Sequence, residues 1–432
     1  SMRASNLYHI VSISGLHMGM LAGFVFAMVR YGLALIGSVA LRWPTKKIAA
    51  VVALVAASIY LWLAGPEVAT QRAYLMAAVM LIAVLFDRRA ISLRTVAIAA
   101  MILLVARPES LTEPGFQMSF GATVALILIY QPWARVQPHV PVLLRPVAML
   151  IVTSLAAGIS TGPIAAAHFN RMSEYGLLAN LLAVPVMGTL VMPAGVVAAM
   201  LAPLGLAAPA LWVMEKGTAW MIAVSDWVGG MEGAVIAVPT PPAAVLPLMA
   251  IGAAVAVLAR GAVRAAALLA LVSSFVLWGT ATRPDLLIAP EGELVGLMTP
   301  KGRALSKSGA GFVADSWLEA DGDTATFQDA AKRLAFEGPR GTRRARFGGH
   351  DVVHLTGKAA AEGLKDACRD GAIVVLAARI DTPGGNCDLY DLDRLRQTGS
   401  VALTDTGGAL QHQTAGGRIG NRLWAPLARK AH

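Results

Sequence analysis

The sequence predicts a polytopic α-helical membrane domain followed by a soluble α/β domain. Of the 432 residues, 56% are hydrophobic and only 14% are charged, a composition too apolar for a soluble globular protein. Apolar blocks follow one another through residues 1–282, whereas residues 283–432 are rich in Asp, Glu, Arg, Lys and Gly and hold no segment long enough to span a bilayer. We therefore place the domain boundary at Thr282–Pro284.

The first domain contains about ten apolar segments that we interpret as membrane spans. Several of them are short or are interrupted by Pro and Gly. Their expected ranges are 9–29, 48–65, 72–86, 93–106, 116–131, 147–167, 177–204, 208–229, 240–259 and 263–281. The stretch 31–41 is too short to cross a bilayer, so we expect it to lie in the interface or to re-enter the membrane.

The distribution of basic residues indicates an orientation. If the first span ends inside, the loops within 30–47, 88–94, 135–145 and 260–264, which carry Arg and Lys, all lie in the cytoplasm. This arrangement leaves the C-terminal domain outside, which is the periplasm if the source is Gram-negative. The net charge of +10 suits anionic lipid headgroups or a polyanionic substrate, and composition does not separate the two.

Two polar side chains near the start of the first span are the best clue to function. Ser14 and His17 lie in the sequence HIVSISGLHMGM, at membrane depth. Polar groups at that depth face the bundle interior or a water-filled cavity, because facing lipid would leave their donors and acceptors unpaired. The plainer alternative is that Ser14 bonds a backbone carbonyl and His17 a neighbouring helix.

Other spans carry polar or helix-breaking residues that a lipid-facing helix would avoid. We expect a polar cavity between broken helices, with Pro and Gly freeing backbone carbonyls along an aqueous path, although kinked packing helices would show the same residues. The candidate lining residues are Ser14, His17, Arg72, Gln117, Ser119, Gly162, Pro163, His168 and Asn180. Trp62, Phe116, Phe120 and Phe169 are candidates to offer flat stacking faces to a ligand in the cavity, with plain packing or an interfacial belt as the alternative.

Several strings in this order resemble the competence domain of the ComEC family over residues 3–230. They are HIVSISGLHMGM, Arg72 with its AYLM continuation, EPGFQMSFGATVAL, and GPIAAAHFNRMSEYGLLANLLAVPVMG. The resemblance implies a multi-pass channel in the bacterial inner membrane that passes single-stranded DNA into the cytoplasm during natural transformation. A typical member also carries an N-terminal OB-like domain and further helices, so we expect a fragment or a truncated member.

The resemblance implies partners but no cofactor. The channel would contact single-stranded DNA and the lipid bilayer, and a periplasmic DNA-delivery protein would supply the strand. The sequence has no Walker-type phosphate loop, so a cytoplasmic ATPase or a strand-capturing protein would supply the energy.

Many family members end in a metallo-β-lactamase-like αββα domain with an HxHxDH metal motif, and residues 283–432 lack that motif. His350 and His354 are four apart on an expected strand, which places them about 13 Å apart, too far to share one ion. The expected strands are DLLIA, ELVGLM, GFVADSWL, DVVHL, AIVVLAA and SVALT, and the expected helices are TFQDAAKRLAF and AAAEGLKDACR. We expect a degenerate, metal-free and non-enzymatic relative.

The two cysteines, Cys368 and Cys387, both lie in this domain. An outside location permits a disulfide that brings them together around AIVVLAA. Two free buried thiols are the alternative.

Two other functions remain open. An intramembrane serine protease would use Ser14 as nucleophile, with His17 or His168 as base. A small-solute transporter is the second alternative, although the internal repeats typical of that class are not visible.

Overall fold

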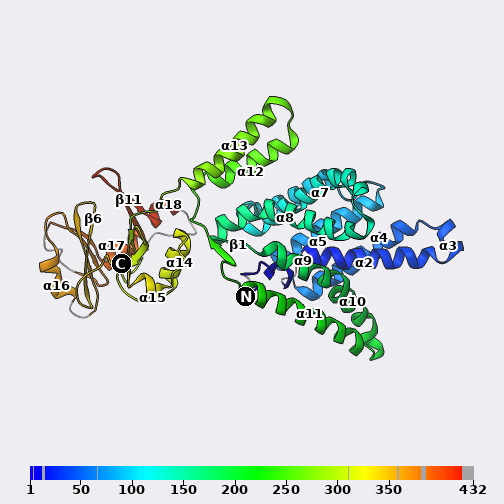
Figure 1. The fold of residues 1–432 in the computed structure, drawn as a ribbon, viewed down its shortest axis with the longest axis horizontal. Helices are drawn as coiled ribbons and strands as arrows, with labels where there is room; N and C mark the ends of the chain where they lie inside the picture. The colour runs from blue at the N-terminus through cyan, green and yellow to red at the C-terminus, as the bar shows by residue number, and fades with distance from the viewer. Residues whose placement is uncertain are drawn as a thin grey trace. The chain divides into compact units, whose positions relative to one another are not determined.

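The computed structural model describes residues 1–2, 4–11, 15–65, 67–309, 311–357, 360–380 and 386–420. The chain divides into two compact units, Ser1–Ile236 and Ala237–His432 (Figure 1). The predicted boundary at Thr282–Pro284 lies within the second unit, between a helix that ends at Gly279 and a strand that begins at Leu286.

The first unit is helical. Its α-helices are α1 (Tyr8–Val11), α2 (Gly15–Ala34), α3 (Gly37–Arg42), α4 (Thr45–Ala64), α5 (Val68–Leu85), α6 (Leu93–Ala106), α7 (Pro114–Val136), α8 (Arg145–Phe169), α9 (Gly176–Val186), α10 (Met192–Leu201) and α11 (Ala208–Gly229). A short 3₁₀ turn, η1 (Pro108–Thr112), precedes α7, and strand β1 (Arg171–Ser173) pairs with β2 (Val235–Ala237). The stretch 31–41 is helical on both sides of a break, because α2 runs to Ala34 and α3 begins at Gly37.

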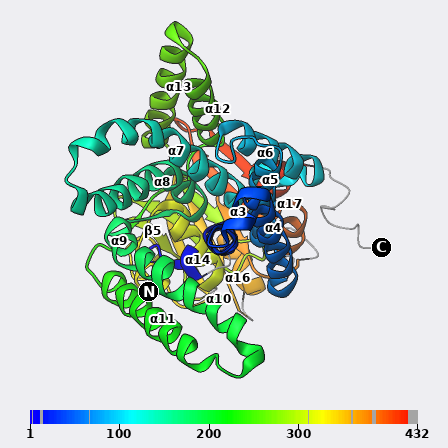
Figure 2. The ribbon, with the colours of Figure 1, turned by 90° about the vertical axis from the view of Figure 1, so that its right-hand side faces the viewer.

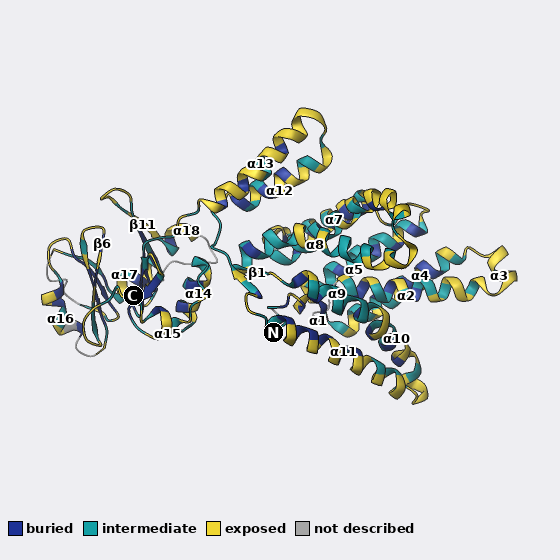
Figure 3. Ribbon diagram, in the orientation of Figure 1, coloured by how far each residue is buried: buried dark blue, intermediate teal, exposed yellow. Residues whose placement is uncertain are grey.

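Length and composition make six helical stretches of the described chain able to cross a membrane. They are Gly15–Ala34, Thr45–Ala64, Val68–Leu85, Val142–Phe169, Gly176–Leu204 and Gly261–Gly279. Helices α7 and α11, of 23 and 22 residues, are also long enough, and α6 is a shorter apolar helix. Together with the exposed apolar surface of these helices (Figure 3), this confirms the predicted polytopic membrane fold.

Small side chains allow close helix packing in this unit. Helix α2 contacts α4 and α5 through Ala22, Ala50 and Ala53, which are at most 5% exposed. Lipid tails are as apolar as the helix side chains, so there is no hydrophobic driving force between membrane helices. Close packing of backbones through small residues drives their association instead. Helices α7 and α8 also pack side by side, as do α10 and α11 (Figure 2).

The two prolines Pro163 and Pro185 affect their helices differently. Helix α8 continues through Gly162 and Pro163 and ends at Phe169, and the next residue, Asn170, has a left-handed φ of 54°. Further along, the expected span 177–204 divides after Pro185, where a π-helical segment, η4 (Met187–Val191), joins α9 to α10. Neighbouring helices re-satisfy the backbone groups that a proline frees, so proline alone does not decide where a membrane helix ends.

The second unit begins with the apolar hairpin of α12 (Val245–Leu258) and α13 (Gly261–Gly279) and continues as a two-sheet sandwich. One sheet has the order β11-β10-β3-β4-β5 and the other has the order β6-β7-β8-β9. The strands are β3 (Leu286–Ile288), β4 (Val295–Thr299), β5 (Gly302–Leu305), β6 (Thr342–Phe347), β7 (His350–Leu355), β8 (Ile373–Leu376), β9 (Asp388–Tyr390), β10 (Val401–Asp405) and β11 (Leu410–Thr414).

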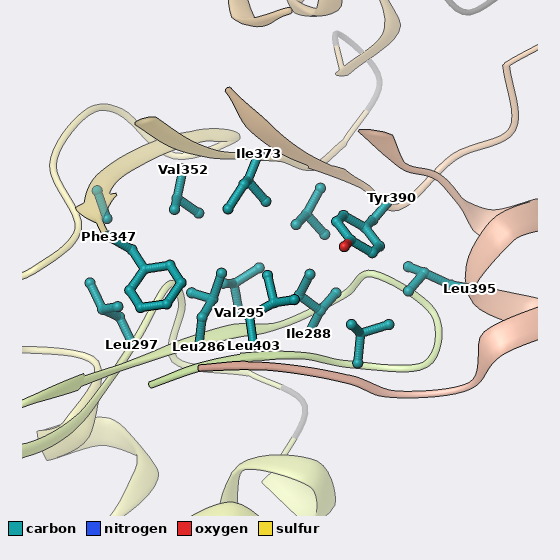
Figure 4. Packing of buried hydrophobic residues seen from close by; sticks show 13 residues of the cluster. Leu286, Ile288, Val295, Leu297, Phe347, Val352, Ile373, Tyr390, Leu395 and Leu403 are labelled. Atoms are coloured by element: carbon teal, nitrogen blue, oxygen red, sulfur yellow. The ribbon is translucent and has the colours of Figure 1, made fainter. Parts of the chain in front are cut away.

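The core of the sandwich lies between the two sheets (Figure 4). Leu286 and Val295 of one sheet face Val352 and Ile373 of the other, and all four are at most 1% exposed. Helices α14 (Gly311–Asp321) and α15 (Phe327–Ala330) cover the outer face of the first sheet, and α16 (Ala360–Ala367) covers that of the second. Two short helices, α17 (Leu392–Thr398) and α18 (Ala415–Ile419), complete the unit. This α/β architecture is the αββα-like domain that the sequence predicts.

Three local expectations in this unit differ from the structure. The run TFQDAAKRLAF, expected as a helix, is helical only over Phe327–Ala330 (α15). The run GFVADSWL, expected as a strand, forms helix α14, because Ala314 and Leu318 are both buried at helical spacing. Strand β6, TRRARF, escaped prediction because three arginines hide its alternating pattern, in which only Ala345 and Phe347 are buried.

The two cysteines form a disulfide, Cys368–Cys387, with a Cα–Cα distance of 5.1 Å. Both lie against the cluster of buried residues under α16, which includes Val374. The bridge joins the end of α16 to the start of β9, around β8.

We predict that the double variant Cys368→Ser/Cys387→Ser lowers the free energy of unfolding by about 3 kcal/mol, because the bridge closes a loop with a sequence separation of 19. The measurement is urea-dependent proteolysis of the α/β unit in the detergent-solubilised chain. Reduced wild type is the control and should match the double variant. Two freely titrating thiols in protein purified without reductant would contradict the bridge.

Candidate channel-lining site

A polar cluster lies where three helices of the first unit end. We use the name polar end cluster for Arg72, Glu113, Gln117 and His168. Arg72 is near the start of α5, Glu113 and Gln117 flank the start of α7, and His168 is in the last turn of α8. The helix ends meet because α6 returns the chain between α5 and α7, while α8 packs alongside α7.

Arg72 is the cation of this cluster. Its Nη1 lies 4.0 Å from Glu113 Oε2, and the two side chains are 11% and 39% exposed. Its Nε is buried without a hydrogen-bond partner. Because a 4.0 Å contact exceeds hydrogen-bond length, Glu113 balances the charge only in part.

Gly115 makes room for the Arg72 guanidinium. A Cβ at position 115 would lie 2.7 Å from Nη2 and 3.1 Å from Cζ of Arg72. The guanidinium therefore lies directly against the first turn of α7, and any larger residue at position 115 would displace it. The position of the cation depends on a glycine that the sequence analysis passed over inside the string EPGF.

Gln117 and His168 form a hydrogen bond between α7 and α8. Gln117 Nε2 donates to the Leu111 carbonyl at 3.0 Å, which assigns the amide oxygen Oε1 to the other side. That oxygen lies 3.0 Å from His168 Nε2. His168 Nε2 must therefore carry the proton and donate it, so the structure brings together two of the predicted lining residues in assigned roles.

The other predicted residues lie elsewhere in the helical unit. Ser119 Oγ donates to Met76 Sδ at 3.9 Å, and Asn180 Oδ1 is buried without a hydrogen-bond partner. His17 is 8% exposed on α2, next to the buried Met18. Ser14 lies outside the described residues, so a single cavity that joins all these groups stays a prediction.

Gly162 and Pro163 lie inside α8, where a Cβ at position 162 would meet only the Met172 side chain, at 3.8 Å.

The predicted stacking aromatics divide into two kinds. Phe116 and Phe120 are 6% and 8% exposed and pack against each other with ring centroids 4.4 Å apart. They therefore belong to the core, and their ring faces are not available to a ligand. Trp62 and Phe169 are exposed. The sequence analysis missed Trp212 and Trp220, whose spacing of eight on one helix was the available signal.

The helical unit and its polar end cluster fall within the reach of a known family model. The model described as Competence protein matches residues 1–263. The chain belongs to the competence protein family. This confirms the resemblance on which the sequence analysis relied, and the competence-family match includes all of the polar end cluster.

Curated competence-family relatives match at modest identity. The chain is 30% identical to ComE operon protein 3 of Bacillus subtilis strain 168, over 45% of the chain and 23% of the relative. It is 29% identical to Recombination protein 2 of Haemophilus influenzae, over 44% and 24%. It is 26% identical to the uncharacterized protein YcaI of Escherichia coli K12, over 44% and 25%. The chain thus spans about a quarter of the length of these relatives. No solved structure gives a significant match.

The α/β sandwich lies beyond the competence-family match, and its two candidate histidines point to separate partners. His350 Nδ1 bonds the Gly371 carbonyl at 2.7 Å, whereas His354 Nε2 bonds the Gly292 carbonyl at 2.9 Å. Among the described residues, no group of three or more His, Cys, Asp or Glu side chains could hold a metal ion.

His354 makes the stability of the sandwich depend on pH. It is 2% exposed, and burial lowers its pKa from 6.5 to about 4, against the raising effect of its bond to Gly292. Because the folded state binds the proton more weakly than the unfolded state, stability is complete above pH 6.5 and falls as the pH drops toward 4.

We predict a loss of up to about 3 kcal/mol between pH 7 and pH 4 from this histidine. His354→Gln, whose amide can still donate to Gly292, should flatten that dependence in urea unfolding followed by proteolysis. His350→Gln serves as the matched control on the same strand and should keep the wild-type dependence. An unchanged pH profile in His354→Gln would contradict the assignment.

Proposed function

We propose that this chain forms the membrane part of a channel that takes up single-stranded DNA across the bacterial inner membrane during natural transformation. The observation that carries the proposal is the coincidence of the competence-family match with a half-buried, partly compensated arginine. A channel for a polyanion must offer phosphates a cation whose charge is not fully satisfied within the protein. Arg72 meets that requirement through its long contact with Glu113 and its unpartnered Nε.

The polar end cluster would act where the strand enters. Arginine binds phosphate oxygens through paired N–H donors, and a phosphate that approaches Arg72 would compete with Glu113 for the guanidinium. The Gln117–His168 hydrogen bond ties α7 to α8 beside this point and would hold the entrance in shape. His17, Ser119 and Asn180 would supply polar groups elsewhere in the helical unit.

The proposed orientation places the polar end cluster and the α/β unit in the periplasm. The Cys368–Cys387 disulfide supports this orientation, because disulfides persist in oxidising compartments. A periplasmic protein would then deliver the strand, and a cytoplasmic ATPase or a strand-capturing protein would draw it through. In this proposal the α/β unit is not an enzyme. No described contact favours the serine protease or the solute transporter.

We predict that Gly115→Ala lowers transformation about as strongly as Arg72→Gln, by ten-fold or more. The added methyl group would clash with the guanidinium of Arg72, which belongs to a flexible side chain and therefore moves away from α7. The charge of Arg72 is unchanged. The measurement is transformation frequency in a competent strain that lacks its own channel and carries each variant at matched membrane levels.

Gly158→Ala is the matched control, since a Cβ at position 158 meets nothing within 4 Å. It should transform like wild type. If Gly115→Ala and Arg72→Gln both transform like wild type, the polar end cluster has no part in uptake.

We predict that His17→Ala also lowers transformation in the same assay. The side chain is buried on α2 beside the contact with α4 and α5, where a polar group must serve either the path or helix packing. Membrane levels and trypsin resistance separate the two roles, because a packing defect would lower both. Gly19→Ala, two residues away in open space, is the control. Full activity of His17→Ala would remove this residue from the mechanism.

A further inference from the structure

Helix α11 carries two tryptophans and a lysine along one groove. From Trp212 to Lys216 and from Lys216 to Trp220 the spacing is four residues, so the three follow one face of the helix at about 6 Å per step. They line a groove of about 380 Å³ that Val186 and Leu190, on α9 and the π-helical segment η4, complete. The two rings are 60% and 50% exposed, and the Lys216 side chain is 58% exposed.

The position of Lys216 argues against a purely lipid-facing groove. Helix α11 has 22 residues and is about 33 Å long, close to the thickness of a bilayer core. Lys216 lies about 12 Å from its first residue, inside the apolar layer if α11 spans it. An exposed lysine at that depth is costly against lipid and marks a ligand path or a water-filled cavity in membrane proteins.

The groove is held open by its own packing. Gly217 lets η4 approach α11, since a Cβ there would lie 2.6 Å from Val191 Cγ2. Trp220 Nε1 donates to the Leu182 carbonyl at 3.1 Å, which fixes the plane of an indole that is still half exposed. A π-helical segment at such a place is typical of functional sites.

The charges suit an anionic ligand with flat aromatic groups. Lys216 Nζ lies 5.9 Å from the centre of the Trp212 ring and 3.3 Å from Glu215 Oε1. Glu215 is exposed and does not line the groove, so a phosphate in the groove can take its place beside Lys216. The described groove thus offers two stacking faces with one exchangeable cation between them.

We propose that the Trp212–Lys216–Trp220 groove is a stacking platform for the bases of single-stranded DNA, an inference that rests on the proposed function. Bases stack on aromatic side chains without regard to sequence, and Lys216 would meet a phosphate between them. The platform deepens the proposed channel by adding a second contact region, formed by helix α11 and separate from the polar end cluster.

The test uses the full chain in nanodiscs of phosphatidylethanolamine and phosphatidylglycerol. Binding of a labelled oligothymidylate is compared with binding of an abasic oligonucleotide of the same length. Trp212→Leu/Trp220→Leu should weaken oligothymidylate binding about 10- to 100-fold and abasic binding little, because stacking needs a base. Lys216→Gln should weaken both equally. The matched control is Trp227→Leu, a tryptophan on the same helix that is 57% exposed and outside the groove, and it should change neither.

The outcomes separate this inference from the proposed function. Wild-type binding of oligothymidylate by the double variant would overturn the platform and leave the channel standing. Absence of binding by the wild type would overturn both. Lipids with brominated acyl chains quench the fluorescence of tryptophans that face them. If they quench the wild type more than the double variant, and oligothymidylate does not reduce that quenching, the two rings face lipid and the platform is overturned.

Discussion

The helical unit depends on the requirement that polar groups inside a membrane find their partners within the protein. Its helices accordingly place their polar side chains where other helices end or pack. Gln117 and His168 join α7 to α8, and Arg72 lies against the start of α7 beside Glu113. The remaining orphaned atoms, such as Asn180 Oδ1, are few among the described residues and cost about 1–3 kcal/mol each. In our proposal, these unpaired polar atoms offset that cost by binding a ligand.

Close packing and polar placement depend on each other in this protein. Gly115 allows the guanidinium of Arg72 to lie on α7, and Gly217 allows η4 to lie on α11. In both places a missing side chain creates the surface that a ligand would contact. The proposed DNA path therefore has two kinds of contact, an arginine near the helix ends and an aromatic groove along one helix. The α/β sandwich is stabilised differently. A hydrophobic core lies between its two sheets, and a disulfide closes one loop.

Much of the architecture followed from elementary patterns. Long apolar runs identified the membrane helices, and alternating short apolar runs identified most strands of the first sheet and the centre of the second. The errors have local causes. GFVADSWL has the composition of a strand and the burial period of a helix, and TRRARF is a strand whose arginines conceal its buried Ala345 and Phe347. Pro163 and Pro185 have the same chemistry, but only the chain after Pro185 leaves the α-helical path, so the proline alone does not decide the outcome.

The sequence by itself determined the two-part organisation, the family and the set of candidate polar residues, since these depend on composition, period and local strings. The tertiary structure decided which of those residues meet. It paired Gln117 with His168, placed Phe116 and Phe120 in the core, and opened a groove between Trp212 and Trp220. Those outcomes depend on where separate helices cross. Small residues far apart in the chain decide these crossings by packing together, so they cannot be predicted from any single segment.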